Sequence, residues 1–229
     1  MALVTLQETT LAHGRGRHRH VVLDSISLAL QPGERVALLG RSGAGKSTLL
    51  EALRGELGNA AAWCPQGQGL VGALSVYHNV YMGRLERTST WRNLRNLLRP
   101  EHHAWEAVAE LCTLLGIGEL LRRPVEQLSG GQRSRVAIAR ALYQARPHFL
   151  GDEPIASVDP HQGARLLRLI TERHGMCLIA LHQRELALTH FDRVIGIEQG
   201  RIALDEPTSD LTLEQLDALY RPWTPASPG

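Results

Sequence analysis

The sequence predicts an α/β fold in which helices cover a parallel sheet. A short apolar run at residues 35–40, "RVALLG", is followed by a glycine-rich loop and then by apolar residues at helical spacing. From residue 132 onward, strand-like runs alternate with helical segments, the pattern of parallel sheets. With 229 residues, 43% of them hydrophobic, the chain is long enough to bury one large core.

The first part of the chain predicts strands. Residues 3–6 and 21–30 show β-branched, alternating patterns, and the polar turn "HGRGRHRH" separates them. The apolar run 35–40 predicts a buried strand, and "STLLEALRGEL" predicts a helix after the glycine-rich loop.

The middle of the chain, from about 74 to 128, predicts a mostly helical insertion. Its clearest helix has apolar residues at positions 105, 108, 111, 112 and 115. A second helix carries Trp91, Leu94 and Leu98 on one face, and its arginines (Arg92, Arg95 and Arg99) are interpreted as a solvated basic face.

The second half predicts alternating elements. A helix begins at about 132, "HFLGD" is a strand, residues 160–174 form a helix and "MCLIALH" is a strand. Two further strands meet at Gln199-Gly200, and we expect the proline-rich end "RPWTPASPG" to be loose.

Composition excludes several classes of protein. A net charge of +2 without a basic stripe argues against nucleic-acid binding. The three cysteines lie far apart, which favours reduced thiols over disulfides or a zinc site. The start lacks the pattern of a signal peptide and no apolar run reaches about eighteen residues, so we expect a chain that is neither exported nor membrane-spanning.

The strongest motif is "GRSGAGKS", residues 40–47, which matches G-x-x-x-x-G-K-[ST] between a strand and a helix. Such a loop wraps backbone amides around phosphate oxygens, its lysine reaches the β- and γ-phosphates, and its serine binds magnesium. The motif therefore predicts a P-loop NTPase with ATP and Mg²⁺ as cofactors. The predicted nucleotide-binding residues of the loop are Gly40, Arg41, Ser42, Gly43, Ala44, Gly45, Lys46, Ser47 and Thr48.

A second motif, "LSGGQ" at 128–132, stands directly before the helix "RSRVAIARAL". With the P-loop before it, the chain resembles the ATP-binding cassette (ABC) family over roughly residues 3–205. The resemblance implies one ABC ATPase domain, 1–229, with a RecA-like parallel-sheet core. That core would span about 1–66 and 132–205, the helical signature subdomain about 70–131 and the C-terminal tail about 206–229. The interval from Lys46 to Gln66 is about half that of relatives, which implies a reduced antiparallel β subdomain.

In this family LSGGQ is called the signature motif. Two ATPase domains pair head to tail, and the signature motif of each domain caps the nucleotide that the other domain holds. The resemblance thus implies a dimer, expected to be a homodimer, in which Ser129, Gly130 and Gly131 contact the γ-phosphate. Asp159 ends "SVD", which matches the family's short dimer-contact loop S-x-L-D with valine in place of leucine. Whether the partner is a second copy or a different subunit stays open.

The letters Asp-Glu-Pro occur twice, in "GDEPIASVD" at 151–159 and "LDEPTSDL" at 204–211. The first stands where the family has its magnesium-binding strand, so Asp152 is expected to hold Mg²⁺ and Glu153 to accept a proton from the attacking water. The strand "CLIALH" ends in His182, which matches the family's switch histidine. The second stretch lacks these companions, and we interpret its Asp205 and Glu206 as a coincidence.

Two further residues complete the predicted site. Gln66, at the end of "WCPQ", matches the glutamine of the family's Q-loop, which touches magnesium and water. His13 falls where relatives stack an aromatic residue on adenine, and an imidazole can stack less well. Metal binding by His13, His18 and His20 is an alternative, although a solvated turn is favoured.

The resemblance implies an ATP-hydrolysing subunit of a bacterial ABC importer. Its partners would be membrane permease subunits and an external solute-binding protein, on the cytoplasmic face of the inner membrane. The stretches "LSVYHNVYMGRLERTSTWRNLRNLLRP" and "DEPIASVDP" resemble phosphonate-importer ATPases, so we expect a phosphonate or phosphite cargo.

Phosphate and amino-acid import are alternatives within the same family. A soluble cassette ATPase that acts on DNA or ribosomes is a further alternative. It is disfavoured because the chain has neither two cassettes nor a long coiled coil between its motifs.

Overall fold

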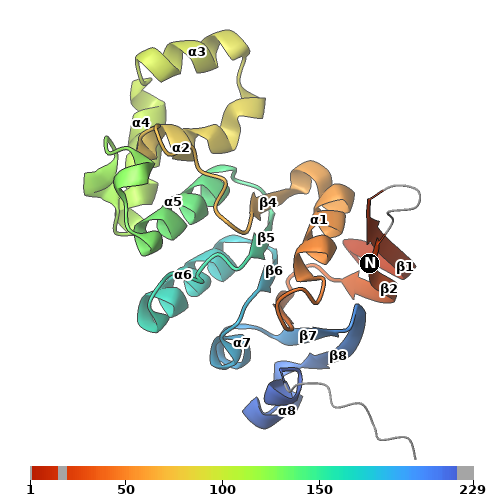
Figure 1. Ribbon diagram of the computed structural model, residues 1–229. Coiled ribbons are helices and arrows are strands. Elements are labelled where there is room, and N and C mark those ends of the chain that lie inside the picture. Colours follow the sequence, from red (N-terminus) through yellow and green to blue (C-terminus); the bar gives the residue numbers. More distant parts are fainter. Residues whose placement is uncertain (1, 15–19, 221–229) are drawn as a thin grey trace, which may run out of the picture.

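The computed structural model describes residues 2–14 and 20–220. At its centre is a six-stranded sheet in the order β4-β5-β6-β3-β7-β8 (Figure 1). Neighbouring strands are parallel except at β7–β8, which form a hairpin. The strands are β3 (Arg35–Leu39), β4 (Ala61–Cys64), β5 (His148–Asp152), β6 (Met176–Ala180), β7 (Arg193–Glu198) and β8 (Arg201–Pro207).

The central strands are buried on both faces, which explains their continuous apolar runs. In β3, Ala37 and Leu39 belong to one core cluster, whereas Val36 and Leu38 belong to the other. The first cluster lies under α5 (Gly130–Tyr143), α6 (Pro160–Arg173) and the helical subdomain, and the second lies under α1 (Lys46–Leu57) and the small sheet.

The small antiparallel sheet has two strands among the described residues, β1 (Val4–His13) and β2 (His20–Leu30). β1 is longer than the predicted strand 3–6 because its second half lies near solvent, where polar residues hide the alternation. Between α1 and β4 the chain forms only the short turn η2 (Gly58–Ala60). The predicted reduction of the antiparallel subdomain is confirmed.

The helical subdomain projects from one end of the sheet (Figure 1). It contains α2 (Val76–Tyr81), α3 (Thr90–Leu98) and α4 (His102–Leu114), together with short 3₁₀ segments after α2 and after α4. These segments are η3 (Met82–Arg87), η4 (Gly118–Leu120) and η5 (Val125–Gln127). Tyr77 is fully buried and packs its ring against Trp105, so α2 and α4 share one core.

The C-terminal helices lie next to the β7–β8 hairpin (Figure 1). α7 (Arg184–His190) follows β6, η6 (Thr208–Asp210) follows β8, and α8 (Leu213–Ala218) packs onto α7. Leu216 and Leu219 are buried in the main core, so part of the predicted tail is integral to the fold. The stretch 221–229, expected to be loose, lies outside the described residues.

The cysteines and the lengths of the helices test two expectations that were drawn from composition. All three cysteines are free and buried, and burial raises the pKa of each thiol to about 12. Within residues 2–14 and 20–220, no helix is both long and apolar enough to cross a bilayer.

Candidate functional site

The site forms where parallel strands end at one edge of the sheet. β3 leads into the phosphate loop, β5 ends at Asp152, and β6 leads to His182. Because the carboxyl ends of parallel strands meet at the same edge, residues far apart in sequence come together there. A cavity of about 200 Å³ opens at this point. It is lined by one residue of β2, by the phosphate loop and by two of the predicted catalytic residues: Val22, Ser42, Gly43, Gly45, Lys46, Ser47, Thr48, Gln66 and Glu153.

Two glycines of the phosphate loop adopt positive φ angles and lie too close to neighbouring atoms to carry a side chain. Gly40 has φ +146°, and a Cβ there would lie 2.4 Å from the carbonyl oxygen of Ile197. Gly45 has φ +109°, and a Cβ there would lie 2.5 Å from Leu23 of β2. Both the conformation and the close approach therefore require glycine.

Lys46 is folded back over the loop that precedes it. The side chain is 5% exposed, and its Nζ donates to the carbonyl oxygens of Gly40 (2.9 Å) and Arg41 (3.3 Å). Its Nζ also lies 3.6 Å from Oε1 of Glu153. This geometry places a buried positive charge at the mouth of the loop, where an anionic phosphate would be attracted.

Asp152 has the properties of a magnesium ligand. Burial raises the pKa of its carboxyl, although a hydrogen bond with Ser47 opposes the shift. Its Oδ1 is buried, and among the described residues it has no hydrogen-bond partner. Mg²⁺ prefers oxygen ligands, and this site offers the unpaired carboxylate oxygen of Asp152 beside the hydroxyl of Ser47. The residues present therefore fit this ion.

Glu153 is surrounded by the other predicted catalytic residues. His182 places its Nε2 2.6 Å from Oε1, and the Nε2 amide of Gln66 lies 3.5 Å from Oε2. The carboxylate is 12% exposed, so it is shielded without being cut off from solvent. The structure thus brings together Glu153, His182, Gln66 and Lys46, which sequence reasoning had placed in one site.

The loop that carries Gln66 is fastened to the signature helix. Nε2 of Gln68 donates to Oγ of Ser134 at 2.9 Å, and Nη1 of Arg140 donates to the carbonyl oxygen of Gly69 at 2.7 Å. Sequence analysis did not identify Ser134 or Arg140. Their place in the signature helix was the available indication, but contacts with a loop about 70 residues away have no local pattern.

The signature residues lie at the start of α5. Ser129 caps the helix, its Oγ accepts from the amide of Gln132 at 3.3 Å, and Gln132 bonds back to the Ser129 amide. Gly130 and Gly131 pack against Ser157. Ser129, Gly130 and Gly131 do not line the cavity at the phosphate loop. Asp159, the last residue of the predicted dimer-contact loop, caps α6: its Oδ1 accepts a hydrogen bond from the Gln162 amide at 3.0 Å.

His13 lies next to the phosphate loop but does not form a cluster. Its Nε2 is 3.0 Å from Oγ1 of Thr48 in α1. The alternative metal site included His18, which lies outside the described residues. Among the described residues, no three His, Cys, Asp or Glu side chains are arranged to hold a metal ion.

The second Asp-Glu-Pro stretch lies in the hairpin at the far side of the sheet. Asp205 accepts from Nε and Nη2 of Arg193 at 2.5 and 2.7 Å, and the same guanidinium bonds Glu34 at 3.2 Å. The structure therefore places Asp205 in an ion pair that fastens β8, whereas Asp152 lies at the phosphate loop.

A C-terminal contact was also missed from the sequence. The hydroxyl oxygen of Tyr220 accepts from the amide of Gly40 at 3.3 Å, and the Tyr220 ring lies under the guanidinium of Arg184, 5.1 Å from its centre. Arg184 in turn pairs with Asp217 of α8 at 2.7 Å. Tyr220, just after α8, thus contacts the first residue of the phosphate loop.

Comparison with known proteins gives one family. Residues 23–156 match a family model described as ABC transporter. A protein of Pseudomonas putida named "Phosphonates import ATP-binding protein PhnC" is 39% identical over 96% of this chain and 90% of its own length. One of Natronomonas pharaonis, named "Phosphonates import ATP-binding protein PhnC 1", is also 39% identical, over 86% of this chain and 92% of its own length.

Solved structures share the fold. A nucleotide-free ATP-binding cassette from an ABC transporter superimposes with a TM-score of 0.76 at 20% identity, covering 97% of this chain and 100% of that chain. A dimeric cassette in a post-hydrolysis state with ADP and Pi gives 0.72 at 23% identity, covering 89% of this chain and 98% of that chain.

Proposed function

Because the chain belongs to the ABC transporter family, we propose that it is the ATP-hydrolysing subunit of a bacterial importer for phosphonates or a related reduced-phosphorus oxyanion. The observation that carries the proposal is that Lys46, Gln66 and His182 surround Glu153 at the phosphate loop. The cargo is proposed because the chain is 39% identical to proteins named as phosphonates import ATP-binding proteins. The four residues at the phosphate loop provide charge, a proton acceptor and orientation for phosphoryl transfer.

Hydrolysis would proceed by positioning and electrostatics. Glu153 would accept the proton of the attacking water, and Gln66 and His182 would orient that water and the γ-phosphate. Lys46 would stabilise the negative charge on the β- and γ-phosphate oxygens. Ser47, Gln66 and Asp152 would hold Mg²⁺, which neutralises phosphate charge when bound. His13 would lie against the adenine.

The proposed active unit is a head-to-tail dimer of this chain. Ser129, Gly130 and Gly131 do not line the cavity at the phosphate loop of their own chain, yet the helix start at Ser129 offers donors suited to an anion. A second copy would bring its signature, and the nearby Asp159, over the nucleotide. ATP would then favour the closed dimer, and hydrolysis would release it.

Transport requires partners that this chain does not contain. We propose that the dimer binds membrane permease subunits on the cytoplasmic side of the inner membrane, with an external solute-binding protein delivering the cargo. The Gln66 loop is suited to transmit closure to the permease because Ser134 and Arg140 fasten it to the signature helix.

Growth on defined phosphorus sources tests the cargo. A deletion strain and its parent would be grown on methylphosphonate, aminoethylphosphonate, phosphite or phosphate as the sole phosphorus source. We expect loss of growth on a reduced-phosphorus source and normal growth on phosphate. Normal growth on all four would contradict the cargo assignment, and loss on phosphate alone would indicate a phosphate importer.

A further inference from the structure

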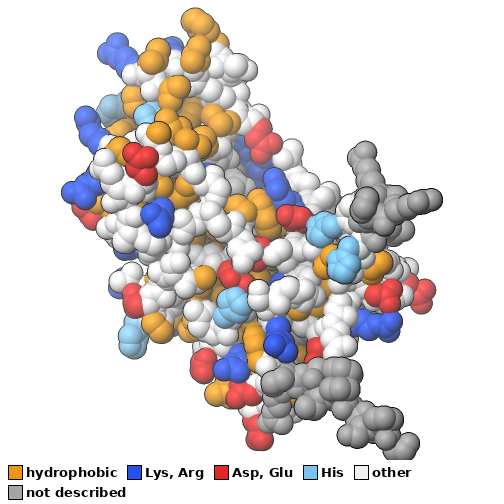
Figure 2. Space-filling model, viewed as in Figure 1, with side chains coloured by type: hydrophobic (Ala, Val, Ile, Leu, Met, Phe, Trp, Pro, Cys, Tyr) orange, Lys and Arg blue, Asp and Glu red, His pale blue; other side chains and the backbone are white. Residues whose placement is uncertain are grey.

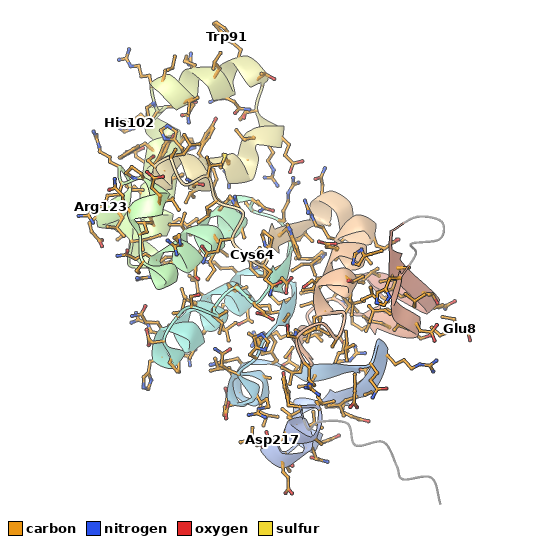
Figure 3. The ribbon with its side chains drawn as sticks, viewed as in Figure 1. Glu8, Cys64, Trp91, His102, Arg123 and Asp217 are labelled. Atoms are coloured by element: carbon orange, nitrogen blue, oxygen red, sulfur yellow. The ribbon has the colours of Figure 1, made fainter. Side chains whose placement is uncertain are left out.

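Helix α3 presents its apolar face to solvent. Trp91 is 77% exposed, Leu94 51% and Leu98 83%, and Leu97 is also exposed. We call these four residues the α3 ridge. Hydrophobic side chains gather over α3 at the top of Figure 2, and Figure 3 shows Trp91 pointing away from the rest of the molecule. Soluble helices normally turn such a face inward, so this orientation requires an explanation.

The opposite, polar face of α3 is the one that packs against the protein. Asn96 is fully buried, and its Oδ1 accepts from the hydroxyl of Tyr77 and the amide of Glu101, both at 2.9 Å. Asn93 accepts from the hydroxyl of Tyr81 at 3.1 Å and donates to the carbonyl oxygen of Leu85 at 3.0 Å. These hydrogen bonds, of which the one between Tyr77 and Asn96 is buried, fix the rotation of α3, so the ridge cannot turn inward without leaving them unmade.

The charge beside the ridge is positive. Residues 87–100 contain four arginines and no aspartate or glutamate. Arg92 and Arg95 pair with Glu101, the residue that precedes α4, while Arg99 makes no ion pair with any described residue. A surface that combines tryptophan and leucine with flanking arginines suits the interface of an anionic bilayer, where apolar side chains enter the acyl boundary and guanidinium groups meet phosphates.

The shape of the ridge favours a flat surface over a peptide. α3 lies at the outer end of the helical subdomain (Figure 1). A groove of about 970 Å³ lies beside it, lined by residues that include Arg95, Arg99 and Trp105. Trp91, Leu94 and Leu98 do not line that groove, so a protein segment seated there would leave the ridge uncovered.

We propose that the α3 ridge rests on the headgroup region of a bilayer that contains anionic lipids, with Trp91, Leu94 and Leu98 inserted shallowly. The contact would hold the subunit against the membrane beside its permease. Its biological setting rests on the proposed function, but the contact itself requires neither ATP nor permease.

Co-sedimentation with vesicles tests the proposal. The full chain would be mixed with vesicles of phosphatidylcholine alone or of equal parts phosphatidylcholine and phosphatidylglycerol, at low and high salt. We expect binding to the anionic vesicles that weakens at high salt. The Trp91→Ala/Leu98→Gln variant should bind at least about tenfold more weakly, because two inserted apolar side chains are lost.

Leu114→Gln is the matched control, since Leu114 is 52% exposed but lies on α4 outside the ridge. It should bind vesicles like the wild type, and all variants should hydrolyse ATP at the wild-type rate, which checks their folding and tests the ATPase assignment separately. Absence of binding to anionic vesicles, or equal binding by wild type and double variant, would overturn the proposal. If the wild type does not bind vesicles, and the double variant no longer co-purifies with detergent-solubilised permease, the ridge is a protein interface instead.

Discussion

Glu153 adopts a backbone conformation that few residues other than glycine accept. Its φ is +52°, and its amide donates to the carbonyl oxygen of Ala180 at 3.2 Å. That bond ties Glu153 to the end of β6, the strand that leads to His182. A conformation of this kind persists only where the surroundings impose it, and functional sites are where such residues gather.

Glu153→Gln and Glu206→Gln form a matched pair that separates the two Asp-Glu-Pro stretches. Loss of the proton acceptor at 153 should slow ATP hydrolysis about 100-fold or more, whereas the exposed β8 position should retain the wild-type rate. Steady-state phosphate release measures both. Equal rates for the two variants would mean that Glu153 is not the base.

Asp152→Asn should raise the stability of the nucleotide-free protein while it lowers ATP hydrolysis. Burial raises the pKa of Asp152, which means that the fold disfavours its charged form, and the asparagine amide carries no charge. Thermal unfolding without nucleotide or magnesium should show a higher Tm for the variant. A lower Tm would contradict the account of Asp152 as a carboxylate that lacks its cation.

At the scale of elements, the hairpin of β7 and β8 depends on Arg193. Its guanidinium bonds Asp205 of β8 and Glu34 at the turn before β3, and these hydrogen bonds raise the pKa of Arg193 further. All three side chains are between 21% and 30% exposed, so the cluster is partly shielded from solvent. Asp205 therefore has a structural explanation that needs no nucleotide.

Arg193→Met should lower the free energy of unfolding by about 1–2 kcal/mol, because two partly buried carboxylates lose their partner. Arg201→Met is the control, since its ion pair with Asp24 is largely exposed and should contribute little. Denaturation by urea measures both variants. The same loss in both would show that the shielding of the Arg193 cluster has no energetic effect.

The elements that the sequence predicted are those with a strong local pattern. The run 35–40, the glycine-rich loop and the alternating segments after 132 all specify their conformation locally, and the structure has strands and helices there. The second half of β1 and the orientation of α3 were not predictable in the same way. Half-exposed strands lose their alternation, and the outward face of α3 is set by Asn93 and Asn96, whose partners on α2 lie elsewhere in the chain.

The candidate site follows the same division. Lys46, Asp152, Glu153 and His182 stand next to strands or in motifs, so the resemblance to the family's motifs was sufficient to expect them together. Ser134, Arg140 and Tyr220 act through contacts over long sequence separations, which no periodicity records. Distant residues that support a loop are found only when the chain is folded.

At the scale of the whole molecule, partly buried histidines link stability to pH. Burial lowers the pKa of His78, His148, His174 and His190 below the ordinary value. Protonation therefore favours the unfolded chain. The stability that depends on the neutral form of these histidines is fully present above about pH 6.5, and it is lost as the pH falls below that value through the lowered pKa values of the folded chain.

Lowering the pH from about 7.5 to 5.5 should reduce the free energy of unfolding, and His174→Gln should weaken this dependence. His174 is the suitable position because it is packed against Phe149, and its Nδ1 bonds the carbonyl oxygen of Ile170 at 2.7 Å. Urea denaturation at several pH values measures the slope. A slope that is unchanged in the variant would assign the pH dependence to other groups.

The arrangement of one chain leaves the predicted ATP site incomplete, because the signature at Ser129 does not line the cavity that Lys46 and Glu153 share. We therefore expect closure of two copies around ATP. It makes the assembly state depend on nucleotide, and blocking hydrolysis should make the closed state persist.

The most direct test is the molar mass of the Glu153→Gln variant in solution, measured by light scattering with and without ATP and Mg²⁺. We expect a single chain without nucleotide and a stable pair of chains with it, and no such shift for Glu153→Gln combined with Ser129→Arg. A mass that does not change on addition of ATP would contradict the claim that two copies complete the site.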